Sequence, residues 1–247
     1  MNPHPDPAWV WMHGTYVPAR EATVSIFDRS FLYGDGLFET LRAYHGRPFQ
    51  VDAHLDRLEA GADFLGIRLP FPREALAGAL AGLLRRNALT EALLRLHLTR
   101  GVGPRGYSPA GAQDPRVIIS AHALPAAARE PRPAWTLATS PLRLPAGDPL
   151  ARLKTANKLP HVLARAAAEA AGADEALLLD PAGAVLETSS ANLFWIAGHT
   201  LHTPPLPDGL LPGVTRSTIL ALGGPLGLAT AETPTRREHL HAADGVF

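Results

Sequence analysis

The chain of 247 residues is long enough for one large domain or two smaller ones, and its 19% charged residues are typical of a soluble protein. Its 23 basic and 23 acidic side chains balance, which argues against nucleic acid or an anionic membrane as a partner. Cysteine is absent, which excludes disulfides and thiolate metal sites, and no apolar run approaches the roughly 18 residues of a membrane span. Residues 1–20 contain prolines and acids where a signal peptide needs an apolar core, so we expect a cytoplasmic protein.

The first half of the chain predicts a hairpin, three strands and two helices. In chain order these elements are expected at residues 10–20, 37–44, 52–65, 72–87, 93–99 and 116–122. Asp52 is expected to cap the first helix, which places Leu55 and Leu58 on one face. Residues 100–109 form a glycine-rich loop that is too long for a tight hairpin.

Three prolines and an alanine run between residues 124 and 133 predict a domain boundary. We therefore expect an N-terminal α/β domain at 1–123, a linker at 124–133 and a C-terminal domain at 134–247. Strands or helices of the second domain are expected at residues 135–138, 160–171, 176–179, 215–222, 227–231 and 236–243. Two α+β domains, with strands meeting at a central cleft, are the predicted architecture.

The segment from Glu187 to Arg216, taken with Lys154, carries the strongest chemical signal. An acid ends one strand, and further along Gly213, Val214 and Thr215 open a helix whose free N–H groups suit a phosphate. An amine, a carboxylate and a phosphate cradle are what pyridoxal phosphate requires for its aldehyde, its ring nitrogen and its phosphate. The combination predicts an enzyme that uses this cofactor.

Each of these residues also has an ordinary interpretation. Lys154 and Glu187 could be solvated surface charges, although lysine is scarce here and Lys158 is the nearest rival in sequence. Arg57 could lie on a helix surface, or its guanidinium could clamp a phosphate. Val214 and Thr215 could belong to an ordinary helix N-terminus.

The glycine-rich loop supplies candidates for substrate binding. Arg105 could bind a carboxylate bidentately, with the hydroxyl of Tyr107 as a second donor, or it could be a solvated charge. Tyr33 lines the same site or belongs to the core. The histidines show no zinc-hydrolase spacing, so no metal is expected, and His161 and Asn157 are assigned structural roles.

The motifs Glu187-x-Ser-x-x-Asn192-Leu-Phe, Leu-x-Thr203 and Leu-x-Gly213-Val-x-Arg216 resemble the signature of class IV, or fold type IV, pyridoxal-phosphate enzymes. The resemblance covers nearly the whole chain. It implies a smaller N-terminal α/β domain, a larger C-terminal domain with a pseudo-barrel sheet, and a homodimer. It also implies cofactor binding by a set of five residues: Lys154 for the aldehyde, Glu187 for the ring nitrogen, and Arg57, Val214 and Thr215 for the phosphate.

Within the family, the loop Arg105-Gly-Tyr107 is similar to that of aminodeoxychorismate lyases, which form 4-aminobenzoate and pyruvate in folate synthesis. Lys154-x-x-Asn157 is similar to both these lyases and the D-amino-acid transaminases. Leu159 stands where the branched-chain aminotransferases usually carry tyrosine. An aminotransferase for D-amino or branched-chain amino acids is the alternative, and both activities imply an amino substrate with a carboxylate. Family members usually continue beyond Phe247, so we expect either a naturally short member or a chain that lacks a C-terminal piece, with fewer phosphate contacts in both cases. The short C-terminus also supports a third alternative, a protein that binds the cofactor or acts as a scaffold without catalysis.

Overall fold

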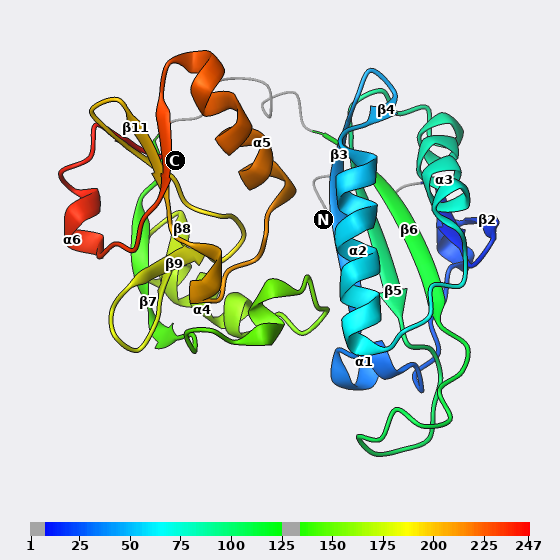
Figure 1. The fold of residues 1–247 in the computed structure, drawn as a ribbon. Coiled ribbons are helices and arrows are strands. Elements are labelled where there is room, and N and C mark those ends of the chain that lie inside the picture. The colour runs from blue at the N-terminus through cyan, green and yellow to red at the C-terminus, as the bar shows by residue number, and fades with distance from the viewer. Residues whose placement is uncertain (1–7, 125–133) are drawn as a thin grey trace. The chain divides into compact units, whose positions relative to one another are not determined.

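The computed structural model describes residues 8–124 and 134–247, which form two compact units (Figure 1). The first unit contains residues 8–124 together with Lys154–Asn157, and the second contains residues 134–153 and 158–247. Both units combine helices with sheets, which confirms the predicted α+β class. Except for Leu124, the predicted linker lies outside the described residues, and the predicted domain boundaries stay a prediction.

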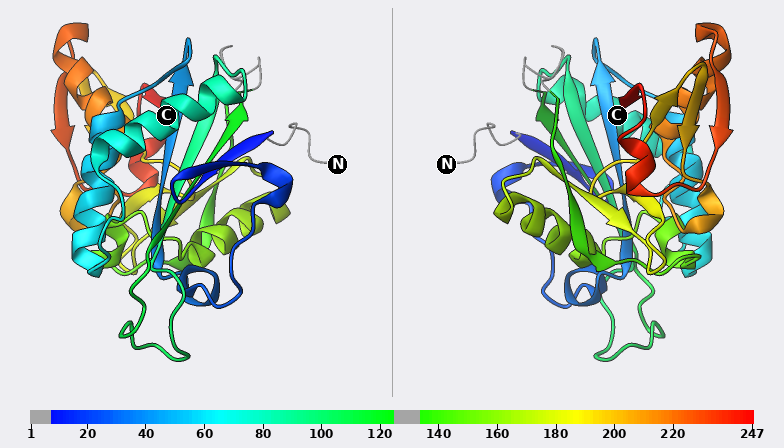
Figure 2. Two further views of the ribbon diagram at one scale, coloured as in Figure 1. Left: turned by 90° about the vertical axis from the view of Figure 1, so that its right-hand side faces the viewer. Right: turned by 90° about the vertical axis from the view of Figure 1, so that its left-hand side faces the viewer.

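A six-stranded antiparallel sheet forms the centre of the first unit, with the strand order β2-β1-β6-β5-β3-β4. Helices α2 and α3 lie on the same side of this sheet (Figure 2), and the short helix α1 precedes β3. The elements are β1 Trp9–Met12, β2 Thr15–Pro18, α1 Arg29–Tyr33, β3 Gly36–Tyr44, β4 Arg47–Pro48, α2 Val51–Leu65, α3 Arg73–Arg86, β5 Ala92–Thr99 and β6 Arg116–Ala123.

The core of the first unit lies between this sheet and the two helices. Leu94, Leu96 and Leu98 alternate along β5 and are fully buried, as the period of two along a strand requires. Leu55 and Leu58, which were predicted to share one face of the first helix, are also buried, as are Leu76, Leu80, Leu83 and Leu84 of α3. Periodicity therefore predicted both helices correctly. The intervening side chains of β3 and β5 belong to the opposite face of the sheet, where Phe38, Arg95 and His97 lie.

The predicted cap of α2 is wrong. Gln50 occupies the N-cap in a left-handed conformation, with φ 53° and ψ 41°, and Asp52 lies within the first turn of the helix. A tight turn after β4 ends at Gln50, and the helix begins at the next residue. The turn therefore sets the start of the helix, and no side-chain capping hydrogen bond is made there. A carboxylate in the first turn still interacts favourably with the helix dipole.

The second unit contains two separate sheets. Strands β7, β8 and β9 form a three-stranded sheet in that order, and the other sheet follows the order β12-β11-β10-β13. Helix α4 packs on β7 and β8, where Ala164 and Ala168 meet Ala176 and Leu178. The elements are β7 Leu137–Arg143, α4 Leu159–Ala170, β8 Glu175–Leu179, β9 Val185–Thr188, β10 Trp195–Ala197, β11 Thr200–Thr203, α5 Val214–Gly223, β12 Ala229–Glu232, α6 Arg237–Leu240 and β13 Gly245–Val246.

Two predicted boundaries in this unit are wrong. The strand expected at 135–138 begins at Leu137, because pairing with β8 starts there and Asp174 instead accepts hydrogen bonds from both the backbone and the hydroxyl of Thr136. The helix expected at 236–243 ends at Leu240, because turns after it lead the chain into β13, which pairs with β10. In the described parts of the chain, no helix is both long enough and apolar enough to cross a membrane.

Candidate active site

Lys154 lies in an extended segment that adds to the edge of β3. The backbone N–H of Phe38 donates to the carbonyl of Lys154 over 2.9 Å, and the N–H of Ala156 donates to Gly36 at the same distance. Lys154 and Phe38 are therefore cross-strand neighbours whose side chains share one face of the sheet. The Lys154 Nζ is 4.8 Å from the centroid of the Phe38 ring. Backbone pairing thus fixes the position of the predicted catalytic lysine.

Arg95 and His97 lie on the same face and were missed by the sequence analysis. Arg95 stacks on Phe38, with its guanidinium carbon 4.1 Å from the ring centroid, and its Nε donates to His97 Nε2 over 2.6 Å. Burial, together with the charge of Arg95, lowers the pKa of His97 to about 4, so this ring is neutral and can accept that hydrogen bond. In the sequence, alternation along β5 indicates only that Arg95 and His97 share one face of the strand. It does not indicate whether that face belongs to a functional site.

Arg57 belongs to a buried cluster with Glu39 and His54. Its Nε donates to Glu39 Oε1 over 2.8 Å, its Nη2 donates to Oε2 over 2.7 Å, and His54 Nδ1 lies 2.6 Å from Oε2. Arg57 is therefore a fixed guanidinium on a buried carboxylate, which differs from the exposed helix-surface arginine considered above. Burial raises the pKa of Glu39, but the hydrogen bonds and charges of Arg57 and His54 outweigh it, and the pKa falls below the usual 4.5.

Replacing Glu39 with glutamine is expected to lower the free energy of unfolding by about 3 kcal/mol at pH 7, because it removes the buried carboxylate that accepts two hydrogen bonds from Arg57. Since the folded-state pKa of Glu39 is depressed, its contribution is present above pH 4.5 and is lost as the pH falls through the folded-state value. Urea denaturation at pH 7 and pH 3.5 should show the wild type and Glu39→Gln converging at low pH. The control Glu238→Gln alters an exposed pair and should change little. Equal stabilities at pH 7 would contradict the buried pair.

Glu187 is the buried acid of the second unit, at the end of β9. Only 8% of the residue is exposed, its Oε2 accepts a hydrogen bond from Asn192 Nδ2 over 3.1 Å, and His161 Nε2 lies 3.8 Å from its Oε1. The buried Nδ1 of His161 has no hydrogen-bond partner among the described residues. The structure therefore places His161, which the sequence left as structural, next to the predicted acid.

Asn192 connects this acid to the turn before α5. Besides Glu187, its Nδ2 donates to the carbonyl of Leu211 over 3.0 Å. Gly213 packs so closely that a Cβ atom added there would overlap Asn192 Oδ1. The two motif segments, which are separated by twenty residues in the sequence, thus meet at one asparagine. The glycine is required by this close approach, and its φ of −67° is ordinary.

Replacing Gly213 with alanine is expected to displace Asn192 from Glu187 and to weaken cofactor retention about tenfold, since one to three kcal/mol is a typical cost of overpacking. Equilibrium dialysis against pyridoxal phosphate measures the effect. Gly224→Ala is the matched control, because a Cβ atom at this other glycine of the same region meets nothing within 4 Å. Equal retention by the two variants would show that the close contact has no role in cofactor binding.

The N-terminus of α5 is formed as the sequence predicted. Gly213 is the N-cap, no side chain within the described residues caps the helix, and Val214 and Thr215 are its first two residues. An uncapped N-terminus offers backbone N–H groups and the positive end of the helix dipole to an anion. Arg216, the last residue of the motif, is buried and pairs with Glu232 over 2.8 Å, so it stabilises this unit.

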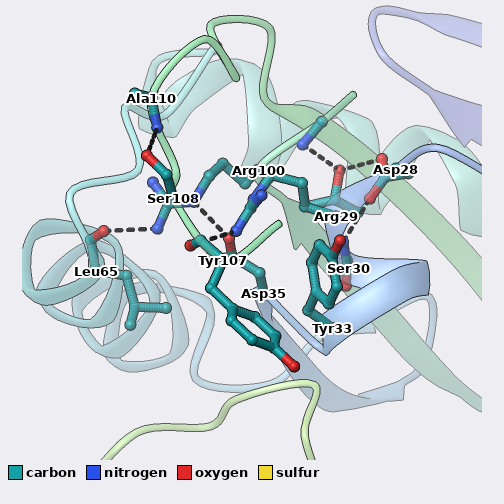
Figure 3. Close-up of polar contacts among 12 residues, drawn as sticks. Asp28, Arg29, Ser30, Tyr33, Asp35, Leu65, Arg100, Tyr107, Ser108 and Ala110 are labelled. Carbon is teal, nitrogen blue, oxygen red and sulfur yellow. Dashed lines mark hydrogen bonds and ion pairs between the residues drawn. The ribbon is translucent and has the colours of Figure 1, made fainter. Parts of the chain in front are cut away.

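Of the three predicted substrate-binding residues, Arg105 and Tyr107 belong to the loop that follows β5, and Tyr33 contacts this loop (Figure 3 shows Tyr33 and Tyr107). The Tyr33 hydroxyl accepts a hydrogen bond from the N–H of Gly106 over 3.1 Å, and the rings of Tyr33 and Tyr107 meet edge to face with centroids 5.7 Å apart. Arg105 is exposed, as is Tyr107, with 89% of its surface accessible. The structure thus brings these residues together at the surface of the first unit.

The residues present fit pyridoxal phosphate. A carboxylate can accept about four hydrogen bonds, so Glu187, which accepts one from Asn192, retains capacity for the N–H of a protonated pyridine. The uncapped start of α5 suits a phosphate, and Lys154 supplies an amine whose backbone is fixed. Among the described residues, no cluster of three or more histidines, cysteines or acids could hold a metal ion.

The comparisons with known proteins identify the family of this chain. The profile of the family described as Amino-transferase class IV matches residues 36–247. A Methanocaldococcus jannaschii protein, provisionally named a branched-chain-amino-acid aminotransferase, is 36% identical over 96% of this chain and 82% of its own. The aminodeoxychorismate lyase of Bacillus subtilis is 31% identical over 94% of this chain and 78% of its own.

A solved structure gives the same result for the fold. The T.th. branched-chain amino acid aminotransferase complexed with N-(5′-phosphopyridoxyl)-L-glutamate matches with a TM-score of 0.91 and 32% sequence identity, covering 98% of this chain and 81% of its own. This match confirms the two-domain fold type IV architecture, and the class IV enzymes depend on pyridoxal phosphate. The chain therefore belongs to the class IV aminotransferase family of pyridoxal-phosphate enzymes.

Proposed function

We propose that this enzyme is a 4-amino-4-deoxychorismate lyase, which forms 4-aminobenzoate and pyruvate. The observation that carries the proposal is the loop in which Tyr107, two residues after Arg105, meets the ring of Tyr33 edge to face. Aromatic rings and a guanidinium suit a cyclic substrate that carries carboxylates. They suit a branched-chain amino acid, with its small aliphatic side chain, less well. The likeness to the Bacillus subtilis aminodeoxychorismate lyase over 94% of the chain supports the same choice.

The proposed roles follow from the chemistry of each side chain. Lys154 would hold the aldehyde of the cofactor, Glu187 would keep its ring nitrogen protonated, and Arg57, Val214 and Thr215 would bind its phosphate. Bound in this way, pyridoxal phosphate supplies an electron sink for the carbon that bears the substrate amine. Arg105 and Tyr107 bind a substrate carboxylate. Arg95 lies over the ring of Phe38, as Lys154 does, so the same face of the sheet carries two cationic side chains.

Lys154 then acts as the base. Its amine takes the proton from the ring carbon that bears the substrate nitrogen, and the bond from the ring to the enolpyruvyl oxygen breaks. The leaving enol takes up a proton to become pyruvate, and the ring that remains is aromatic. Atoms and electrons balance without an oxidant or an acceptor keto acid.

The test is to incubate the purified protein with pyridoxal phosphate and 4-amino-4-deoxychorismate and to measure pyruvate and 4-aminobenzoate. We expect the two products to appear in equal amounts without added keto acid. Matched assays with D-alanine, D-glutamate or L-leucine and 2-oxoglutarate should be inactive. Amino transfer in those assays, together with no release of pyruvate from the first substrate, would contradict the lyase.

An aminotransferase is the second candidate, because the Methanocaldococcus jannaschii relative and the T.th. structure carry names of branched-chain aminotransferases. It would use the same lysine and acid, and Lys154 would move a proton without the departure of a leaving group from the substrate. Absorbance spectra of the protein mixed with each amino acid alone distinguish the two activities, since only transamination converts the bound cofactor to its amine form.

A further inference from the structure

Arg29 is a buried arginine whose guanidinium is directed at a surface loop (Figure 3). Its side chain is 3% exposed, and its Nε donates to Asp35 Oδ2 over 2.8 Å. Its Nη1 donates to the carbonyl of Gly106 over 2.9 Å, and its Nη2 donates to the carbonyl of Tyr107 over 3.0 Å. Two of the three guanidinium nitrogens thus bind consecutive peptides directly after Arg105.

Tyr33 holds the same turn from the other side. Its hydroxyl accepts the N–H of Gly106, so both polar groups of this residue are bound, and Gly106 has a left-handed φ of 101°. The Arg29 guanidinium carbon lies 4.9 Å from the centroid of the Tyr33 ring, which in turn contacts Tyr107. The turn is therefore bound by charge-assisted hydrogen bonds and by aromatic contacts.

The base of this assembly is anchored in the core. Asp35 also accepts from Arg100 Nε over 2.8 Å, and Arg100 donates to the carbonyls of Leu65 and Gly66 at the end of α2. Asp28 caps α1 through Ser30 and accepts the hydroxyl of Thr99. The hydrogen bonds of Arg29 thus connect the exposed turn to a fixed network.

Core stability does not explain this arrangement. Residues 104–111 are all exposed, so they bury little apolar surface. Burying a guanidinium is costly unless each of its hydrogen bonds is made, and an apolar side chain of similar size could fill the same space. The charge is matched to the carbonyls of the turn, which indicates that the conformation of the turn matters.

We propose that Arg29 is a positioning residue that fixes the turn at Gly106 and Tyr107, so that Arg105 and Tyr107 form a preformed arm for a substrate carboxylate. The arm's role rests on the proposed function, whereas the fixing of the turn does not. A preformed arm reduces the entropy lost on binding, so its loss raises KM more than it lowers kcat.

Limited digestion with trypsin tests the fixing of the turn, since trypsin cleaves after Arg105 only when the local backbone opens. Arg29→Lys keeps the positive charge and the number of tryptic sites but cannot form the planar fork. We expect cleavage after Arg105 to be about tenfold faster, from the loss of charged hydrogen bonds. Arg20→Lys, at an exposed arginine, is the matched control. Unchanged cleavage in Arg29→Lys overturns the proposal.

Tyr33→Phe provides a second variant that leaves the buried charges in place. It removes the acceptor of the Gly106 N–H, and we expect cleavage after Arg105 to be about threefold faster, as for one neutral hydrogen bond. Mass spectrometry of the fragments identifies the cleaved bond. If trypsin cleaves after Arg105 at the same rate in Tyr33→Phe as in the wild type, the result contradicts the proposal. This test remains valid even if Arg29→Lys does not fold.

Kinetics test the link to the substrate. We expect Arg29→Lys to raise KM about tenfold with kcat within about twofold, and we expect this effect to shrink when Arg105 is already glutamine. If Arg29 had a purely structural role, Arg29→Lys would raise KM by the same factor with arginine or glutamine at position 105. That result would contradict the proposal. A wild-type KM in Arg105→Gln overturns the carboxylate role of the arm, and with it that part of the proposed function, while the digestion result stands separately.

Discussion

Replacing Lys154 with alanine is expected to lower the turnover of the lyase by about 10³-fold or more, while the protein stays folded. The amine is both the attachment point of the cofactor and the proposed base, and a positioned base alone contributes about 10²- to 10⁴-fold. The hydrogen bonds that join this segment to β3 are formed by the backbone of Lys154 and Ala156, so they survive the substitution. Turnover is measured as pyruvate release, and folding is measured by circular dichroism and thermal unfolding.

The chain offers a matched control, because its two lysines are Lys154 and Lys158. Lys158 is the N-cap of α4 and makes no side-chain capping hydrogen bond, so Lys158→Ala should retain turnover within about threefold. Added ethylamine should restore part of the activity of Lys154→Ala and none to Lys158→Ala. Full turnover in Lys154→Ala, or a loss of turnover in Lys158→Ala alone, would contradict the roles of Lys154 as cofactor attachment point and base. Lys158 would then be the candidate for both roles.

Replacing Glu187 with glutamine is expected to reduce turnover by about 10²- to 10³-fold, the range seen when one preorganised electrostatic contact is removed. An amide is nearly isosteric with the carboxylate, but it cannot hold the pyridine nitrogen in its protonated form. The fold should be preserved, since Asn192 can still contact the new side chain. Turnover and the absorbance spectrum of the bound cofactor as a function of pH are the measurements.

Glu169→Gln is the control for this substitution. Glu169 is an exposed acid of α4 that pairs with Arg165, and its removal should leave turnover and spectrum unchanged. Wild-type turnover in Glu187→Gln would show that another group protonates the ring nitrogen, and His161 would be examined next because it lies 3.8 Å from this acid.

Sequence reasoning predicted the elements whose signal is local. Both long helices of the first unit follow from leucines at helical spacing, and strand β3 before them follows from alternation. The failures concern non-local geometry. The N-cap of α2 depends on a turn after β4, and the start of β7 depends on its register with β8, which the sequence of neither segment specifies.

The candidate site shows the same division. The motif around Glu187 and Gly213 pointed to the cofactor, and the structure adds that Asn192 connects the two. The partner of Arg57 could not be predicted, because Glu39 lies eighteen residues away on another element. The contacts of Arg29 could not be predicted either, since they are made with a loop that follows some seventy-seven residues later.

The central claim is that Lys154 holds the cofactor, and chemical mapping tests it most directly. The protein purified with pyridoxal phosphate is reduced with borohydride, which makes the bond between the lysine nitrogen and the cofactor permanent, and the modified peptide is identified by mass spectrometry. We predict one modification per chain, at Lys154, in the wild type and in Lys158→Ala. Stoichiometric modification at Lys158, or none at either lysine in protein that releases pyruvate, would contradict the claim.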